Sequence, residues 1–159
     1  MSGAKEKRRS ARIPFRPSDG VQVHYKFLSH LPSYQCETIF RGSVLNLSKG
    51  GVLFSGPIPG PEWLSHLGQG EILIGMNLIG RGDRIKALAS LRWTRPAKSE
   101  GSDSDSGEVD PTRGPEYELG VQFEQLDPAH RRGLSRLLIG HQLRTRKLRP
   151  SQIHDLEGY

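Results

Sequence analysis

Three arginines stand close together near the beginning of the chain, in the segment KEKRRSARIPF. Arg8, Arg9 and Arg12 carry planar guanidinium groups, which bond phosphate bidentately, stack on aromatic faces and match the O6/N7 edge of guanine. These residues therefore have the chemistry to hold a planar anion. A solvated charge cluster, or a weak contact to nucleic acid, is the simpler interpretation of such a basic run taken alone.

A second polar cluster interrupts two strand-like runs in the segment GSVLNLSKGGVLF, residues 42–54. Asn46 and Ser48 can bond nearby backbone groups, and Gly50 and Gly51 can adopt the positive φ that tight turns require. One interpretation is therefore only a turn. The other is a ligand site, in which short side chains leave room for a bound molecule.

Charge is distributed unevenly along the 159 residues, whose net charge is +6. Residues 1–16 hold six basic side chains and one acidic, and residues 131–149 hold seven basic and none acidic. Residues 97–116, in contrast, hold two basic and six acidic side chains. The basic ends favour an anionic partner. We do not expect nucleic acid to be that partner, because no base-reading motif accompanies the charges and the acidic stretch opposes binding.

Several function classes have no supporting residues. Cys36 is the single cysteine, so neither an internal disulfide nor a Cys-based zinc cluster is expected, and the six histidines lack metal-binding spacing. The sequence has no nucleophile elbow, phosphate loop or dinucleotide-binding glycine motif, so we expect no enzyme activity, metal or cofactor. It also shows no signal peptide and no apolar run of about 18 residues. We therefore expect a cytoplasmic protein without a membrane span.

Alternation of apolar residues predicts six short strands. They cover residues 21–28, 36–48, 51–55, 71–79, 84–94 and 117–124. After the last strand the apolar period becomes helical, with Asp127 as N-cap and Pro128 as the first helical residue. Strands followed by one helix predict an all-β fold, an antiparallel barrel or sandwich, covered by a terminal helix. Trp63 and Trp93 are predicted to lie in the core, with a supporting place beside a ligand as the alternative.

The chain is expected to hold one domain between two tails. We predict a flexible basic arm over residues 1–16, a barrel with its closing helix over residues 17–143, and a C-terminal tail over residues 144–159. Residues 97–115 are acidic and rich in serine and glycine, so a disordered loop is predicted within the domain.

The two polar clusters together resemble the signature of the PilZ domain family, the bacterial receptor module for cyclic di-GMP. Its RxxxR motif matches Arg8 to Arg12, just before the first predicted strand, and its [D/N]xSxxG motif matches Asn46 to Gly51 after the second. The segments LRWT and LGVQFEQLDPAHRRGLSRLL resemble the late strands and closing helix of the family. The resemblance covers about residues 8–140, and the order of the motifs makes it specific.

The resemblance implies a six-stranded antiparallel β-barrel plus a C-terminal α-helix, with cyclic di-GMP held on the outer surface between arm and turn. It implies that arginines of the arm grip phosphates and guanine edges, and that the polar residues and glycines of the turn form the floor. The ligand-binding residues are then Arg8, Arg9, Arg12, Asn46, Ser48, Gly50 and Gly51, with Lys7 and Trp93 in support. A cation at position 7 favours a stacked pair of nucleotides over a single one.

The function implied is a non-enzymatic cyclic di-GMP receptor or adaptor, which changes its surface on binding and regulates a partner protein. Motility, biofilm formation and exopolysaccharide output are the processes that such receptors control, and the sequence does not identify the partner. The alternative is a PilZ-like adaptor that binds a motility or secretion partner without nucleotide. Intact arginines and an intact glycine motif favour the receptor.

Overall fold

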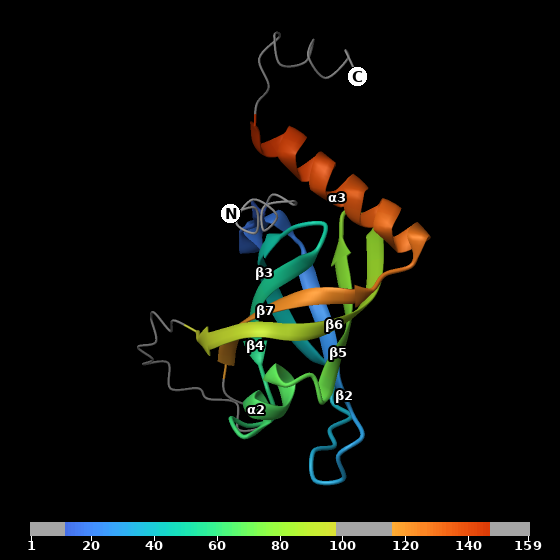
Figure 1. Cartoon of the computed structure of the whole chain (residues 1–159). Helices are drawn as coiled ribbons and strands as arrows, with labels where there is room; N and C mark the ends of the chain where they lie inside the picture. The colour runs from blue at the N-terminus through green and yellow to red at the C-terminus, as the bar shows by residue number, and fades with distance from the viewer. Residues whose placement is uncertain (1–11, 98–115, 147–159) are drawn as a thin grey trace, which may run out of the picture.

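Strands of the chain close into an antiparallel barrel in the computed structural model, which describes residues 12–97 and 116–146 (Figure 1). Within these residues the barrel has six strands: β2 Gln22–Ser29, β3 Phe40–Leu47, β4 Gly51–Pro57, β5 Ile72–Gly80, β6 Asp83–Pro96 and β7 Glu116–Gln125. Their neighbours run in the order β3-β2-β5-β6-β7-β4, and an additional β3–β4 pairing closes the ring. The six-stranded antiparallel barrel with a terminal helix is therefore confirmed.

The core of the barrel is formed by the inward rows of the strands. On β2 the side chains of Val23, Tyr25 and Phe27 are buried while their neighbours face outward, as a period of two requires. Phe54 of β4 is fully buried and its ring centroid lies 4.8 Å from that of Tyr25. Burial of each large apolar side chain contributes about 1.5–3 kcal/mol to folding, so these rows hold the wall in place.

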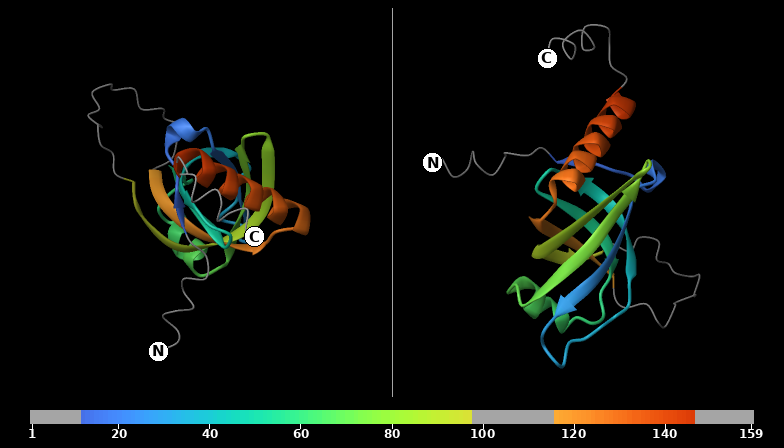
Figure 2. Two further views of the ribbon diagram at one scale, coloured as in Figure 1. Left: turned by 90° about the horizontal axis from the view of Figure 1, so that it is seen from above. Right: turned by 90° about the vertical axis from the view of Figure 1, so that its right-hand side faces the viewer.

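Helix α3, Pro128–Arg146, lies across one end of the barrel, as the view from above shows (Figure 2). It begins as expected at Pro128, and the carbonyl of Asp127 accepts the Arg131 N–H at 2.8 Å. Its residues Leu134, Leu137 and Leu138 are buried against the barrel. The helix continues to Arg146, so it is longer than the predicted domain boundary at residue 143 allows.

The short helix α2, Trp63–Gly68, lies at the opposite end of the barrel (Figure 1). Trp63 and Leu67 are its buried residues, which confirms Trp63 as a core side chain. In residues 12–97 and 116–146, no helix has the length and apolar character that crossing a lipid bilayer requires.

The chain enters the barrel earlier than the prediction of a flexible arm over residues 1–16 allows. Strand β1, Ile13–Pro14, pairs with Leu47 and Asn46 of β3, and the 3-10 helix η1, Pro17–Asp19, follows it. Phe15 is buried and its N–H donates to the carbonyl of Leu45 at 2.8 Å. The prediction is wrong for residues 13–16, because an apolar Ile-Pro-Phe sequence has a place on the edge of β3. Residues 1–11, 98–115 and 147–159 lie outside the described residues.

Candidate functional site

A groove of about 660 Å³ on the outer wall of the barrel contains residues from both predicted motifs. Arg12, at the end of the first motif, lines it together with Asn46, Ser48, Gly50 and Gly51 of the second. These segments are far apart in the sequence and meet because β1 pairs with the end of β3.

An extra residue in β3 turns Asn46 toward this groove. Val44 pairs with Phe54 and Asn46 with Leu53, so Leu45 has no position of its own in the β3–β4 register. Such a β-bulge reverses the alternation of side chains beyond it. Val44 and Leu47 are consequently both buried, and Asn46 between them is only half-buried. Without the bulge Asn46 would face the barrel interior.

The hydroxyl of Ser48 is occupied by the turn that joins β3 to β4. Its Oγ accepts the Gly50 N–H at 3.2 Å and lies 3.4 Å from the Gly51 carbonyl, to which it donates. The Ser48 N–H also donates to the Gly51 carbonyl, at 3.0 Å. Ser48 lines the groove, but its bonds are those of a local turn, so its first role is to fix the shape of the floor.

The two glycines of this turn have different surroundings, and neither uses the positive φ that glycine permits in tight turns. At Gly51 a Cβ would stand 2.1 Å from the Val121 carbonyl oxygen of β7, so only glycine allows the two backbones to approach. At Gly50 a Cβ would meet nothing within 4 Å. Gly50 is thus the position where the absence of a side chain leaves free space over the groove.

A second bulge, in β6, places Trp93 on the same groove. Inward positions of β6 alternate through Ile85, Ala87, Ala89 and Leu91, and unbroken alternation would continue to Trp93. The register shifts between Leu91 and Trp93, where Arg92 is the additional residue. Trp93 is therefore half-buried on the outer wall, so the prediction of a core position for it is wrong.

The Trp93 ring rests on a glycine of the next strand. Trp93 is paired with Gly120 of β7, where a Cβ would stand 2.5 Å from the indole Nε1. The guanidinium carbon of Arg95 lies 5.4 Å from the centroid of the ring, which is a cation–π distance. The Nε–H of Arg95 donates to Glu118 at 2.6 Å, so this arginine is held in place. The indole is therefore a fixed flat surface at the edge of the groove.

Sequence reasoning misses two polar side chains of the groove. Arg92 is exposed at the bulge, and Gln122 is exposed on β7 in register with Gly51. Together with Arg12 they give the described part of the groove two guanidinium groups and no carboxylate among its lining residues. The potential there favours an anion. Lys7, Arg8 and Arg9 lie outside the described residues.

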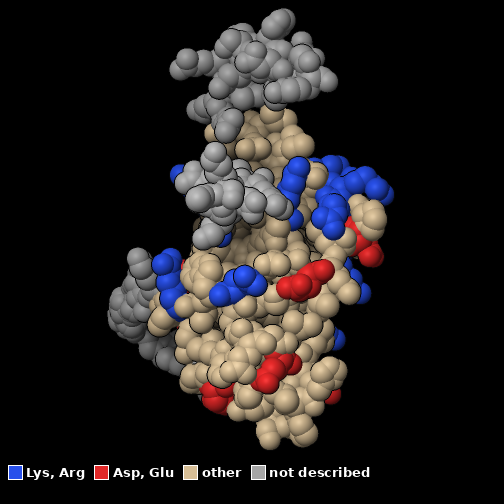
Figure 3. Space-filling model, in the orientation of Figure 1, with Lys and Arg blue, Asp and Glu red and all other residues tan. Residues whose placement is uncertain are grey.

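Positive charge on this side of the molecule is not confined to the groove (Figure 3). On the face that carries β6 and β7, Lys and Arg side chains gather beside α3, while acidic side chains are scattered (Figure 3). Among residues 12–97 and 116–146, no three His, Cys, Asp or Glu side chains are grouped as metal ligands would be.

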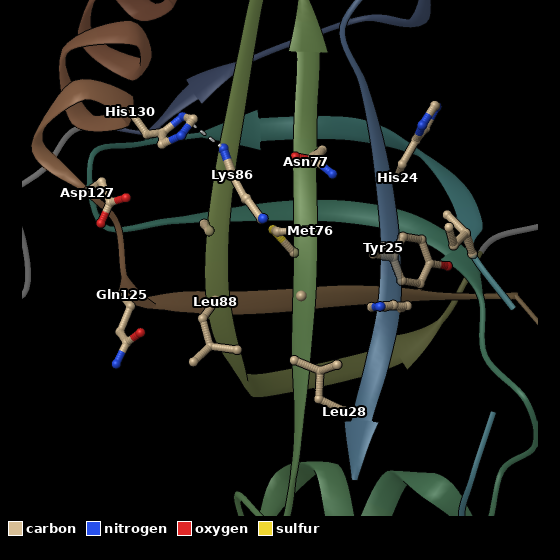
Figure 4. A pocket seen from close by; sticks show the side chains of 14 residues that line it. His24, Tyr25, Leu28, Met76, Asn77, Lys86, Leu88, Gln125, Asp127 and His130 are labelled. Atoms are coloured by element: carbon tan, nitrogen blue, oxygen red, sulfur yellow. Dashed lines mark hydrogen bonds between the residues drawn. The ribbon is translucent and has the colours of Figure 1, made fainter. Parts of the chain in front are cut away.

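A second groove, of about 600 Å³, lies on the wall formed by β2, β5 and β6 (Figure 4). His24, Asn77 and Lys86 occupy adjacent positions on these strands. The Lys86 N–H donates to His130 Nδ1 at 3.2 Å, which ties the start of α3 to β6. This groove contains neither predicted motif, and Asp127 contributes a carboxylate to its lining.

The structure is thus a small closed β-barrel domain with a helix across one end and a basic groove outside its wall. The sequence matches the family model described as PilZ domain over residues 6–140. The chain therefore belongs to the PilZ domain family, which confirms the resemblance of its motifs.

Solved structures share this fold at low sequence identity. The complex of MrkH from K. pneumonia with c-di-GMP has a TM-score of 0.58 at 14% identity, covering 88% of this chain and 54% of that one. The PilZ domain of Escherichia coli YcgR with c-di-GMP has a TM-score of 0.54 at 14% identity, covering 89% and 95%. The inhibitor of motility MotI/DgrA of Bacillus subtilis has a TM-score of 0.51 at 14% identity, covering 87% and 53%.

The chain spans about half the length of the MrkH chains that it matches, 51% and 54%. No curated protein gives a significant match. At such identities the likeness to solved structures concerns the fold, and the ligand and partner must be argued from the residues of this chain.

Proposed function

We propose that this protein is a cytoplasmic, non-enzymatic receptor for cyclic di-GMP, which binds the nucleotide in the groove beside the β3–β4 turn and regulates a partner protein. The observation that carries the proposal is the meeting of Arg12 with Asn46, Ser48 and Gly50 around one groove. Membership of the PilZ family supports it, as do the titles of the YcgR and MrkH structures, which name c-di-GMP with those proteins.

The two arginines that line the groove are suited to the phosphates of the ligand. Arg12 and Arg92 are both exposed, so their guanidinium groups have not been committed to the core. A hydrogen bond to a charged group contributes about 1.5–3 kcal/mol, and a bidentate arginine forms two. Loss of either arginine is therefore expected to weaken binding by roughly ten- to a hundredfold, since about 1.4 kcal/mol corresponds to a factor of ten.

Arg8 and Arg9 are proposed to add further guanidinium groups to the same ligand. Three residues separate Arg8 from Arg12, and a chain spans at most about 3.5 Å per residue. A chain of four peptide units can therefore reach about 14 Å from Arg12, which itself lines the groove. Lys7 is proposed to add positive charge, which suits the higher charge of a stacked pair of nucleotides.

Guanine recognition is assigned to the neutral side chains of the groove. The amides of Asn46 and Gln122 each offer both a donor and an acceptor, which a guanine edge also presents. Trp93 offers a flat aromatic surface on which a purine can stack, and such stacking contributes about 1–3 kcal/mol per base. Free space over Gly50 leaves room for the ligand near the turn.

The partner acts downstream of nucleotide binding. Motility, biofilm formation and exopolysaccharide output are the proposed processes, and the neighbours described as a motility inhibitor and a transcription regulatory factor are consistent with such roles. The receptor would bind its partner through surface that the nucleotide alters, because the function we assign involves no chemical conversion of the ligand.

Isothermal titration calorimetry with cyclic di-GMP tests the proposal on the full chain. We expect saturable binding by the wild type and roughly ten- to a hundredfold weaker binding by Arg12→Ala and Arg92→Ala. Lys86→Ala is the matched control, because it removes an exposed cation from the second groove. The molar ratio at saturation also tells whether one nucleotide or a pair is bound.

Two results would contradict the receptor. Absence of heat at tens of micromolar wild-type protein, roughly the affinity range expected of such a module, would reject nucleotide binding and favour the nucleotide-independent adaptor. Equal losses in Arg12→Ala, Arg92→Ala and Lys86→Ala would indicate nonspecific charge attraction rather than a site. Cyclic di-AMP and GTP serve as competing ligands that are expected to bind more weakly.

A further inference from the structure

A buried histidine of α3 contacts the segment that leads from the arginine motif into the barrel. His141 is only 3% exposed, and its ring stacks on Phe15 with 3.9 Å between centroids and 14° between planes. Its Nε2 lies 3.0 Å from the carbonyl oxygen of Pro14. A carbonyl can only accept, so Nε2 carries a proton and the ring donates.

An aspartate at the end of the same segment contacts both the segment and His141. Asp19 Oδ2 accepts the Arg16 N–H at 2.7 Å and lies 3.8 Å from His141 Nε2. Residues 14–19 therefore form a compact bend whose inner groups face one histidine. Buried polar contacts of this kind specify one arrangement of the groups that share them.

This bend is directly connected to the candidate nucleotide site. Arg12 is the residue immediately before β1. Pro14, whose carbonyl oxygen His141 contacts, is paired with Asn46 of β3. Both the arginine motif and the second motif thus reach the Pro14 peptide. The views in Figures 1 and 2 show the start of the described chain running beneath α3, where this contact occurs.

We propose that His141 is a positioning residue for the nucleotide site: it fixes the base of the arginine segment and so couples the position of Arg12 to that of α3. The inference rests on the proposed function. If the contact orients Arg12 for the ligand, bound ligand must in turn stabilise α3 in this position, because coupling between two sites is reciprocal. Helix α3 would then be the element through which occupancy reaches the rest of the surface.

Two substitutions separate the hydrogen bond from the stacking. His141→Phe keeps a flat ring against Phe15 and removes the donor to Pro14, whereas His141→Gln keeps an N–H donor at a similar distance from the backbone. Leu134→Ala is the control for general loosening of the helix. Leu134 is fully buried next to Gly133, where α3 approaches Ile85 of β6, away from Pro14.

The first measurement uses the protein without ligand. Amide hydrogen exchange in residues 13–20 should be faster in His141→Phe than in wild type, and slower again in His141→Gln. Leu134→Ala should lower the melting temperature without this local increase. Equal exchange of residues 13–20 in His141→Phe and wild type would overturn the contact itself, whatever the nucleotide does.

The second measurement adds cyclic di-GMP. We expect the dissociation constant to rise about three- to tenfold in His141→Phe, as loss of one neutral hydrogen bond implies. Binding should recover in His141→Gln and remain near wild type in Leu134→Ala. Saturating nucleotide should also slow exchange in residues 137–146 of the wild type, and not in His141→Phe.

The outcomes distinguish this inference from the function on which it rests. Wild type that does not bind cyclic di-GMP rejects the proposed function, and with it any role of His141 in nucleotide binding. Wild type that binds, with an unchanged dissociation constant in His141→Phe and unchanged exchange of α3 on saturation, rejects the positioning role alone.

Discussion

The two grooves on the barrel wall differ in how their strands are paired. The groove with the two motifs lies where β3 and β6 each contain an extra residue, at Leu45 and Arg92. The second groove lies mainly on β2, β5 and the first part of β6, whose pairings with one another show no register shift; a shift between Leu88 and Ala89 in the β6–β7 pairing lies only at its edge. Irregular pairing therefore accompanies the groove that we assign to the ligand, as is common for β-bulges near binding sites.

The chemistry of the two grooves differs in parallel with their pairing. Cations of the first are arginines beside an indole and three glycines, a set that suits planar anions. Cations of the second are Lys26 and Lys86, with the exposed apolar side chain of Leu28 near them. Lysine is a point charge on a flexible stem and does not define an orientation. Positive charge alone thus does not make the two surfaces equivalent.

The largest effect is expected from Gly51→Ala, which would remove the close approach of β4 to β7. The added methyl group would stand 2.1 Å from the Val121 carbonyl oxygen, so the backbones must separate. We expect a loss of about 3 kcal/mol in the free energy of unfolding, measured by urea denaturation. Gly50→Ala is the matched control and should unfold like the wild type, since nothing lies within 4 Å of its Cβ. Equal destabilisation by both substitutions would contradict the described turn.

Trp93→Leu is expected to have the next largest effect, on nucleotide binding rather than on stability. Loss of a stacking surface should weaken cyclic di-GMP binding by roughly ten- to a hundredfold, corresponding to about 1–3 kcal/mol. The signal can be isolated in Trp63→Phe, where Trp93 is the remaining tryptophan and its fluorescence should change on titration. In Trp93→Phe the buried Trp63 should report no change. A response of Trp63 instead would place the ligand at the other end of the barrel.

Gln122→Ala sharpens the comparison at the level of base identity. Removal of one amide that reads a guanine edge should weaken cyclic di-GMP by about fivefold, as expected for one or two neutral hydrogen bonds. Binding of cyclic di-AMP should change less. The dissociation constant of cyclic di-AMP divided by that of cyclic di-GMP, which measures selectivity for guanine, should therefore fall. If both ligands weaken equally, Gln122 contributes shape and not selectivity.

The smallest effect is expected in the second groove, from Gly75→Ala. Its Cβ would stand 3.3 Å from Cδ1 of Leu28, the end of an exposed and adjustable side chain. The free energy of unfolding should remain within about 0.5 kcal/mol of wild type, and the dissociation constant for cyclic di-GMP should not change. Weaker nucleotide binding by this variant would indicate that the ligand binds in the second groove instead, which would contradict the proposed site.

The strands can be predicted from the sequence because a half-buried strand alternates apolar and polar residues along its own length, whichever strands it pairs with. The alternation of Val23, Tyr25 and Phe27 with polar neighbours indicates the inward row directly. The start of the helix is equally local, since Pro128 fixes the first turn. The sequence of the two motifs likewise identifies Arg12, Asn46 and Ser48, which the structure brings to one groove.

The misassigned residues depend on pairing partners that lie far away in the chain. Alternation along β6 predicts an inward Trp93, and only the register with β7 reveals that Arg92 is an extra residue. Gly51 reads as a turn glycine, but its requirement comes from the Val121 carbonyl of another strand. Gln122 has an outward position within its predicted strand, yet nothing in chain order places it opposite Gly51.

The extra residue at Arg92 bears on how relatives of this domain should be compared. A homologue without it would have one residue fewer between Leu91 and Trp93, and its aromatic side chain would turn from the solvent into the interior. Alignments that place no gap at this position would then equate side chains on opposite faces of the wall. Insertions and deletions of a single residue in late strands are therefore a means by which such domains can acquire or lose contacts to a ligand without changing their signature motifs.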